Sequence, residues 1–83
     1  MPQVIFSQEG RADFDALPVT IQARVLGIVD RLALWPAVSG AKALRKEWRG
    51  AYRIRTGDWR VIFEVRAAVV IIRIRHRSQV YED

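Results

Sequence analysis

The sequence contains no cysteine and only one histidine among its 83 residues. Without thiolates the chain can form neither disulfides nor a thiolate metal site, and no cluster of His, Asp and Glu has the spacing of metal ligands. The sequence also lacks a glycine-rich phosphate loop and a Ser-His-Asp set. These absences argue against a metalloenzyme or an NTPase, so we expect neither a metal nor a cofactor.

Long apolar runs are missing as well. No stretch approaches the roughly 20 residues needed to cross a bilayer. The first ten residues lack the basic segment and apolar run of a secretory signal. With 51% hydrophobic and 28% charged residues, the composition is typical of a small globular protein. The sequence therefore predicts one cytoplasmic domain over residues 1–83 that does not associate with a membrane.

Acidic residues are too few in the second half of the chain to balance its basic residues. Residues 42–83 hold eleven Lys and Arg against five acids, a charge of +6, whereas residues 1–41 hold three Arg against four acids, a charge of −1. Most of the excess is arginine, whose planar fork suits bidentate contacts to phosphate. A polyanion is therefore the expected partner. Nucleic acid is favoured over a membrane, because no basic amphipathic helix accompanies the charge.

The first third of the chain has the pattern of one strand and two helices. The apolar run Pro2–Phe6 is typical of an edge strand. Ser7 is a candidate N-cap for a helix over residues 7–17, and Pro18 suits the first turn of a second helix. That second helix ends at the Trp35-Pro36 pair, because the residue before proline avoids the α region. Its apolar stripe recurs at helical spacing and consists of Ile21, Val25, Ile28, Val29 and Leu32.

The rest of the chain is predicted to be a loop followed by three strands. In the loop over residues 36–50, Leu44 and Trp48 are expected to anchor into the core. The strands cover Ala51–Thr56, Trp59–Arg66 and Val69–His76, and two-residue turns at Gly57-Asp58 and Ala67-Ala68 join them. The order β-α-α-β-β-β predicts an α+β fold: an N-terminal strand, an antiparallel helical hairpin and a three-strand antiparallel meander. Both helices would cover one face of the single small sheet and leave the other face open.

The two turns fix which residues of the meander lie opposite each other. The first turn pairs Arg55 with Arg60. The second pairs Arg60 with Arg75, and it also sets Phe63 opposite Ile72 and Val65 opposite Val70. Because strand side chains alternate between faces, the predicted core face carries Tyr52, Ile54, Trp59, Val61, Phe63, Val65, Val70, Ile72 and Ile74. The opposite face carries Ile62, Glu64, Ile71 and the arginines Arg53, Arg55, Arg60, Arg73 and Arg75.

On that opposite face, Arg55, Arg60 and Arg75 form one row across all three strands. Like charges directly opposite each other weaken a sheet, by up to roughly 1 kcal/mol per pair. A domain of this size has little stability to spare, so the row predicts an anion bound on it. An odd-length turn at Ala67-Ala68 would shift the third strand and break the row.

Several of these residues together resemble the RelE/ParE superfamily of bacterial toxins. The matching strings are Lys42-x-Leu44, Tyr52-Arg-Ile-Arg, Gly57-Asp58-Trp59-Arg60-Val-Ile-Phe and His76-Arg77-x-x-Val80-Tyr81. The order of elements agrees too, so the resemblance covers nearly the whole chain. For the RelE branch it implies an endoribonuclease that cuts messenger RNA in the ribosomal A site, with the substrate's 2′-hydroxyl attacking the adjacent phosphate and no metal ion. For the ParE branch it implies an inhibitor of DNA gyrase that lacks the ribonuclease residues.

The resemblance also implies site residues and a partner. The RelE pattern places catalytic residues at Arg53, Arg55, Arg60, Arg75, Arg77 and Tyr81. Further basic residues are interpreted as contacts to RNA, to the ribosome or to an antitoxin: Lys42, Arg45, Lys46, Arg49 and Arg73. The implied partner is an antitoxin that blocks the basic face, with the toxin either monomeric or in a toxin–antitoxin hetero-oligomer. The convergent arginines favour the RelE branch, because a gyrase inhibitor needs no phosphate site.

The sequence departs from the RelE pattern in one respect. Many RelE-type toxins carry lysine on the first meander strand, where a neutral amine can act as general base. Arg53 and Arg55 stay protonated at accessible pH and can hardly accept a proton. The remaining candidates are Tyr81, Glu64 and His76, and the last is expected on the core side beside Trp59, where a structural role is favoured. A degenerate module that only binds antitoxin or RNA therefore stays open as an alternative.

Overall fold

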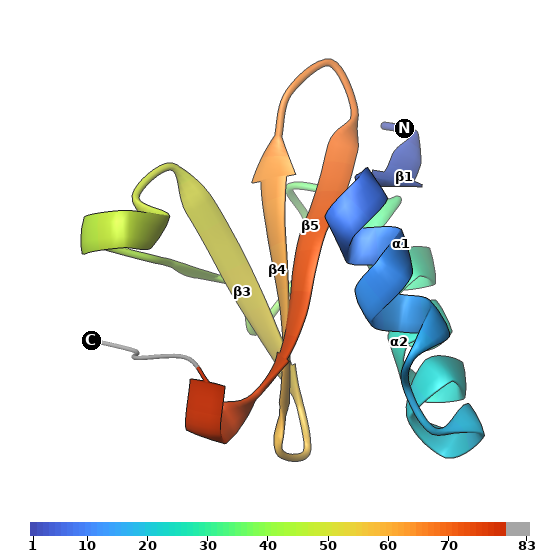
Figure 1. The fold of residues 1–83 in the computed structure, drawn as a ribbon. Coiled ribbons are helices and arrows are strands. Elements are labelled where there is room, and N and C mark those ends of the chain that lie inside the picture. The colour runs from blue at the N-terminus through green and yellow to red at the C-terminus, as the bar shows by residue number, and fades with distance from the viewer. Residues whose placement is uncertain (80–83) are drawn as a thin grey trace.

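The computed structural model describes residues 1–79 as a five-stranded sheet with two helices on one face (Figure 1). The strands are β1 (Val4–Phe6), β2 (Lys42–Ala43), β3 (Ala51–Thr56), β4 (Trp59–Val65) and β5 (Val69–His76). The helices are α1 (Gln8–Asp15) and α2 (Val19–Leu32), and two short 3-10 helices are η1 (Lys46–Trp48) and η2 (Arg77–Gln79). Within this part of the chain, no helix is both long and apolar enough to cross a bilayer.

The strand order is β1-β5-β4-β3-β2, so the N-terminal strand lies at an edge as predicted. The predicted α+β fold with both helices on one face is confirmed. The sheet has two features that the prediction lacked. First, β1 runs parallel to β5, whereas the other pairs are antiparallel. Second, the segment over residues 36–50 is not all loop, because it contributes β2 and η1.

Helix α1 begins at the predicted cap and lies directly on β5. The Ser7 hydroxyl accepts a hydrogen bond from the Gly10 N–H at 3.0 Å, which satisfies one of the free donors of the first turn. Gly10 is buried against β5, and a Cβ there would lie 2.2 Å from the Ile71 carbonyl oxygen. The helix can therefore approach the strand this closely only with glycine at this position.

Helix α2 supplies one side of the main core. Of its predicted stripe, Val25, Ile28 and Leu32 are buried, while Ile21 and Val29 pack at the margin. The sheet supplies the other side with Ile54, Val61, Phe63, Val69, Ile71 and Ile74. After the helix, Trp35 closes this core by packing edge-on against Tyr52 and Phe63, with ring centroids 4.9 and 5.4 Å apart.

The β3–β4 register agrees with the prediction at every pair from Tyr52–Phe63 to Thr56–Trp59. The β4–β5 register agrees only near the His76 end, where Arg60 faces Arg75 and Val61 faces Ile74. Toward the connecting loop the predicted partners are wrong, because Phe63 faces Ile71 and Val65 faces Val69. The loop holds three residues, 66–68, and a β-bulge at Ile72 takes up the extra residue.

The bulge also corrects the predicted faces of β5. Val69 and Ile71 belong to the main core, although Ile71 was predicted on the arginine-bearing face. Ile72 was predicted in the core, but it packs on the opposite face. Val70, two residues before it, lies on that opposite face as well, because strand side chains alternate. Val65, also predicted in the core, is 40% exposed at the end of β4. An odd-length loop was expected to break the arginine row, but the bulge restores the pairing before the strand reaches Arg75.

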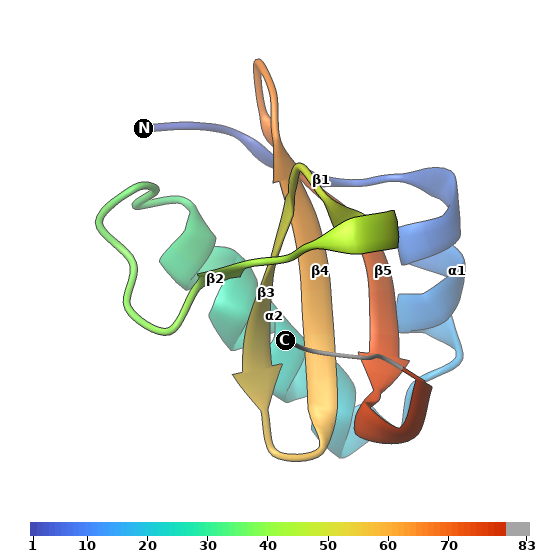
Figure 2. The same ribbon diagram turned by 90° about the vertical axis from the view of Figure 1, so that its left-hand side faces the viewer.

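A second, smaller core lies on the face away from the helices, which we call the outer face. Leu44, Ala51 and Ile62 are buried there, with Trp48 and Ile72 packed against them. Leu44 and Trp48 are thus anchors, as predicted, but of this second cluster and not of the main core. Figure 2 shows β2 and η1 passing in front of the sheet. The prediction of an open outer face is therefore wrong for the half of the sheet near the start of β3.

Candidate nucleic-acid interface

The predicted arginine row is present on the outer face. Arg55 on β3 pairs with Arg60 on β4, which pairs with Arg75 on β5. Directly opposed residues of neighbouring strands lie about 5 Å apart, so the row brings three guanidinium groups to one line across the sheet. It lies near the β3–β4 turn, at the end of the strands away from η1. This clustering of like charge is the arrangement that a bound phosphate would stabilise.

Arg60 is the most constrained member of the row. Its residue is 9% exposed, and Nη1 donates to the carbonyl oxygens of Gly57 and Trp59 at 3.2 and 3.3 Å. Gly57 has φ of 59°, the left-handed conformation that the two-residue turn requires. The carbonyls of the turn and of the first residue of β4 therefore hold the guanidinium of Arg60 in place. A preorganised cation of this kind stabilises developing negative charge without reorganising during reaction.

Arg75 has an unsatisfied donor. Its Nε is buried and has no hydrogen-bond partner among the described residues. Leaving a buried donor unpaired is costly, more so on a charged group, and such atoms are rare in folded proteins. An anion on the row would provide the missing acceptor. Arg75 therefore offers the row a donor that no described residue satisfies.

A second basic row runs beside the first. Lys42 on β2 pairs with Arg53, Arg53 pairs with Ile62, and Ile62 pairs with Arg73. This row lies two residues, about 7 Å, from the first along the strands. Arg53 is 8% exposed and donates through Nη1 to the Gly40 carbonyl at 3.2 Å. The sequence could not place Lys42 in this row, because two residues of strand within a loop carry almost no pattern.

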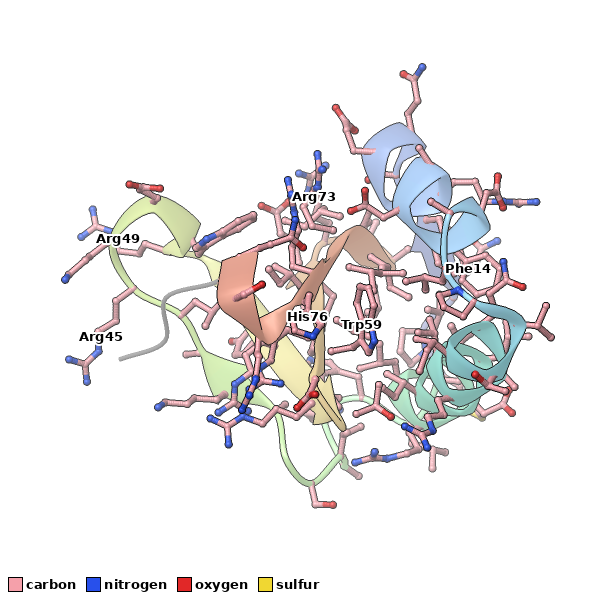
Figure 3. The ribbon with its side chains drawn as sticks, turned by 60° about the horizontal axis from the view of Figure 1, so that its bottom comes forward. Phe14, Arg45, Arg49, Trp59, Arg73 and His76 are labelled. Carbon is pink, nitrogen blue, oxygen red and sulfur yellow. The ribbon has the colours of Figure 1, made fainter. Side chains whose placement is uncertain are left out.

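Arg73 is engaged by helix α1. Its Nε lies 3.0 Å from Asp13 Oδ2, and its Nη2 donates to Asp13 Oδ1 at 3.3 Å. Asp13 Oδ2 also accepts from the Ile74 backbone N–H at 2.9 Å. Figure 3 shows Arg73 beside α1. Asp13 thus fastens α1 to the edge of β5, a role that sequence reasoning missed because the partners are sixty residues apart.

We expect Asp13→Ala to lower the free energy of unfolding by about 1.5–3 kcal/mol, because it removes charge-assisted hydrogen bonds from a half-buried arginine and a strand N–H. Urea denaturation would measure the change. Asp15→Ala is the matched control on the same helix. Its ion pair with Arg11 is exposed, with side chains 67% and 59% accessible, and is worth only about 0.3–0.5 kcal/mol. Equal losses in the two variants would contradict the role of Asp13.

Arg77 and His76 lie where β5 passes into η2. The Arg77 N–H donates to the Asp58 carbonyl at 2.7 Å, and its Nε lies 3.7 Å from Asp58 Oδ1. Arg77 therefore joins η2 to the β3–β4 turn, close to the row. His76 packs edge-on against Trp59 with centroids 5.3 Å apart, which confirms its predicted position (Figure 3). Its Nδ1 is 3.0 Å from the Ser78 hydroxyl. Tyr81 lies outside the described residues.

The remaining predicted contacts flank η1 and do not join the rows. Arg45 precedes this 3-10 helix, Lys46 begins it and Arg49 follows it, and all three are exposed. Figure 3 shows Arg45 and Arg49 extending away from the sheet. The structure thus separates the predicted residues into two groups: a convergent set over the strands and a peripheral set on η1. Among residues 1–79, no group of three or more metal-ligating side chains could hold a metal ion.

The fold is that of a class of small toxins, the RelE/ParE superfamily, as comparisons with known proteins show. The family model described as "ParE toxin of type II toxin-antitoxin system, parDE" matches residues 4–81. The chain belongs to this family of type II toxin–antitoxin toxins. The predicted resemblance to the superfamily is therefore confirmed.

Individual relatives come from both the sequence and the structure comparisons. Toxin RelG of Mycobacterium tuberculosis is 33% identical over 86 residues, covering 98% of each chain. The toxin–antitoxin complex RelBE2 of the same organism contains a chain that is 31% identical, with a TM-score of 0.79 over 93% of this chain and 92% of that one. The isolated Escherichia coli RelE toxin has a TM-score of 0.75 over 92% and 84% of the two chains, and its identity of 14% shows the shared fold alone.

Proposed function

We propose that this toxin is an endoribonuclease that cleaves messenger RNA at the ribosome in the cytoplasm. In this reaction the substrate's own 2′-hydroxyl loses its proton and attacks the adjacent phosphate, the bond from phosphorus to the 5′-oxygen of the next nucleotide breaks, and that oxygen leaves as a 5′-hydroxyl once it is protonated; no metal ion takes part. The observation that carries the proposal is the cross-strand row of Arg55, Arg60 and Arg75. Negative charge accumulates on the phosphate in the pentacoordinate transition state, and arginines held in advance around it lower that barrier.

Each residue of the site has a role in the proposed reaction that follows from its position. Arg60 grips the scissile phosphate, Arg75 offers its buried Nε–H, and the exposed Arg55 meets the strand as it enters. Arg53 in the second row and Arg77 at the β3–β4 turn border this centre. The other predicted basic residues contact ribosomal RNA or the flanking message: Lys42 and Arg73 of the second row, and Arg45, Lys46 and Arg49 at η1.

The proton acceptor must be a group other than these arginines. His76 is directed at Trp59, on the opposite side of the sheet from the row. Glu64 pairs with Arg66 and lies four residues along β4 from Arg60, about 13 Å away. Two candidates remain for general base: Tyr81, which the resemblance suggested, and Lys42, which the pairing of β2 with β3 places opposite Arg53.

We further propose that the partner is an antitoxin protein. Chains similar to this one occur in toxin–antitoxin complexes from Mycobacterium tuberculosis and Methanococcus jannaschii. The charge of +6 in residues 42–83 suits a partner with acidic surface. An antitoxin over the outer face would cover the arginine row and hold the toxin inactive in a hetero-oligomer.

A cell-free translation assay with the purified toxin tests the activity. We expect protein synthesis to stop and primer extension to map new messenger RNA ends within codons, because the row acts on phosphates of a message held on the ribosome. A gyrase supercoiling assay with the same preparation should show no inhibition. Intact message together with inhibited supercoiling would instead establish a ParE-type target, which the name of the matching family model favours. No effect in either assay would indicate a module that only binds.

A further inference from the structure

A pocket opens at the edge of the sheet, between α2 and the end of β3. Its volume is about 270 Å³, and six residues line it: Arg24, Gly27, Ile28 and Arg31 from α2, and Arg55 and Thr56 from β3. Three of the six are arginines and none is acidic. Arg55 belongs both to this pocket and to the arginine row. The pocket is therefore a basic extension of the outer face around the end of β3, beyond the residues of β3 that pair with β2.

The three arginines come from two sides. Arg24 and Arg31 are seven residues apart on α2, about two helical turns, so they lie on one face of the helix. Arg31 Nη2 donates to the Ser39 carbonyl at 2.6 Å, which holds its guanidinium at the pocket. Arg24 reaches toward the β3–β4 turn, since a Cβ on Gly57 would lie 3.2 Å from its Nη1. Together with Arg55 on β3, these two residues bring arginines from a helix and from a strand to the same pocket.

Gly27 sits between Arg24 and Arg31 in the middle of α2. Glycine in a helix interior destabilises the helix relative to alanine. At Gly10 the fold explains the glycine, because a Cβ would collide with β5; at Gly27 a Cβ would meet no atom within 4 Å. Nothing within the described residues therefore requires glycine here. A glycine of this kind leaves room for an incoming group to approach the helix backbone.

We propose that this pocket is a second phosphate-binding site, which holds a backbone phosphate of the RNA strand that lies on the arginine row. The inference rests on the proposed function and extends it from the scissile phosphate to a neighbouring one. Arg55 connects the two sites, the forked guanidinium groups suit bidentate phosphate contacts, and the Thr56 hydroxyl adds a donor. The open space above Gly27 admits the sugar–phosphate backbone.

Substitution of Gly27 distinguishes an effect on protein stability from an effect on RNA binding, because stability should rise while RNA affinity falls. We expect Gly27→Ala to raise the melting temperature by about 4 °C. We expect the same variant to weaken binding of a short single-stranded RNA about three- to tenfold, measured by fluorescence anisotropy. Arg24→Ala should weaken binding to a similar extent and reduce the slope of log K against log salt by about 0.7, the value for one lost phosphate contact on a single strand.

Arg11→Ala is the matched control, because it removes one exposed arginine from α1, away from the pocket. Equal weakening by Arg11→Ala and Arg24→Ala would show a long-range charge effect and overturn the proposal. So would an unchanged RNA affinity in Gly27→Ala. A parallel titration with a polyglutamate peptide tests whether the pocket binds an acidic protein segment instead. If Gly27→Ala and Arg24→Ala weaken binding of the peptide but not of the RNA, the pocket belongs to such a segment and the RNA site is overturned.

The same measurements distinguish this inference from the proposed function. A wild-type toxin that binds RNA without cleaving the message, and whose binding Gly27→Ala weakens, would support the pocket and refute the endoribonuclease. A wild-type toxin that cleaves the message, and whose RNA affinity Gly27→Ala leaves unchanged, would support the endoribonuclease and refute the pocket.

Discussion

Gly10→Ala is expected to destabilise the protein by about 3 kcal/mol or more, a large share of the total stability of a small domain. The new Cβ would lie 2.2 Å from the Ile71 carbonyl oxygen and 3.0 Å from its carbon. That carbonyl cannot move aside easily, because Ile71 is paired with Phe6 on one side and Phe63 on the other. Alanine normally stabilises a helix by about 1 kcal/mol relative to glycine, so the collision with β5 decides the sign.

Thermal unfolding followed by circular dichroism would measure this effect. Gly27→Ala provides the matched control, since it makes the same substitution in a helix where a Cβ meets nothing within 4 Å. The two variants should move the melting temperature in opposite directions. A Gly10→Ala protein as stable as the wild type would show that α1 does not rest on β5 as closely as described.

Arg60→Ala is expected to lower the rate of messenger RNA cleavage by about 10²–10³, the usual cost of removing one preorganised donor from a transition state. The side chain is almost buried, and the carbonyls of Gly57 in the turn and Trp59 at the start of β4 hold its guanidinium, so neither Arg55 nor Arg75 can take its place. Arg60→Lys should recover only part of the rate, because an ammonium group retains the charge but lacks the planar fork.

Single-turnover cleavage on programmed ribosomes would measure this loss. Arg66→Ala is the control: it removes the same charge from the opposite end of β4, where Arg66 is exposed and pairs with Glu64. It should cleave at the wild-type rate. Circular dichroism would verify that both variants are folded. Wild-type activity in Arg60→Ala would remove the arginine row from the active site.

The sequence predicts those parts of this fold that depend on short-range patterns. The Ser7 cap and the stripe of α2 follow from local chemistry, and both are confirmed. Gly57-Asp58 marks its turn clearly, so the β3–β4 register and the pairing of Arg55 with Arg60 could be predicted. The pairing of Arg60 with Arg75 is also correct, but the two-residue turn from which it was predicted is not. An extra loop residue and a bulge cancel each other.

Other features depend on contacts that no local pattern encodes. Ala67-Ala68 carries no turn signal, so the length of the second loop was ambiguous. Asp13 looks like any acid on a helix surface until β5 is placed beside it. Leu44 and Trp48 were recognised as apolar anchors, but the sequence could not say on which face of the sheet they pack. The pocket between α2 and β3 likewise arises only when Arg24, Arg31 and Arg55 meet in three dimensions.

The bulge at Ile72 separates β5 into two halves, and the side chains of each half alternate between the faces in a register of their own. Residues on the loop side follow the hairpin, with Val69 and Ile71 facing the helices, while residues beyond the bulge follow the arginine row. One residue of length can thus be exchanged between loop and strand without turning Arg75 to the wrong face. A change of one residue in the loop over residues 66–68 that shifts the register of β5 is therefore compatible with the arginine row when the loss or gain of a bulge residue offsets it.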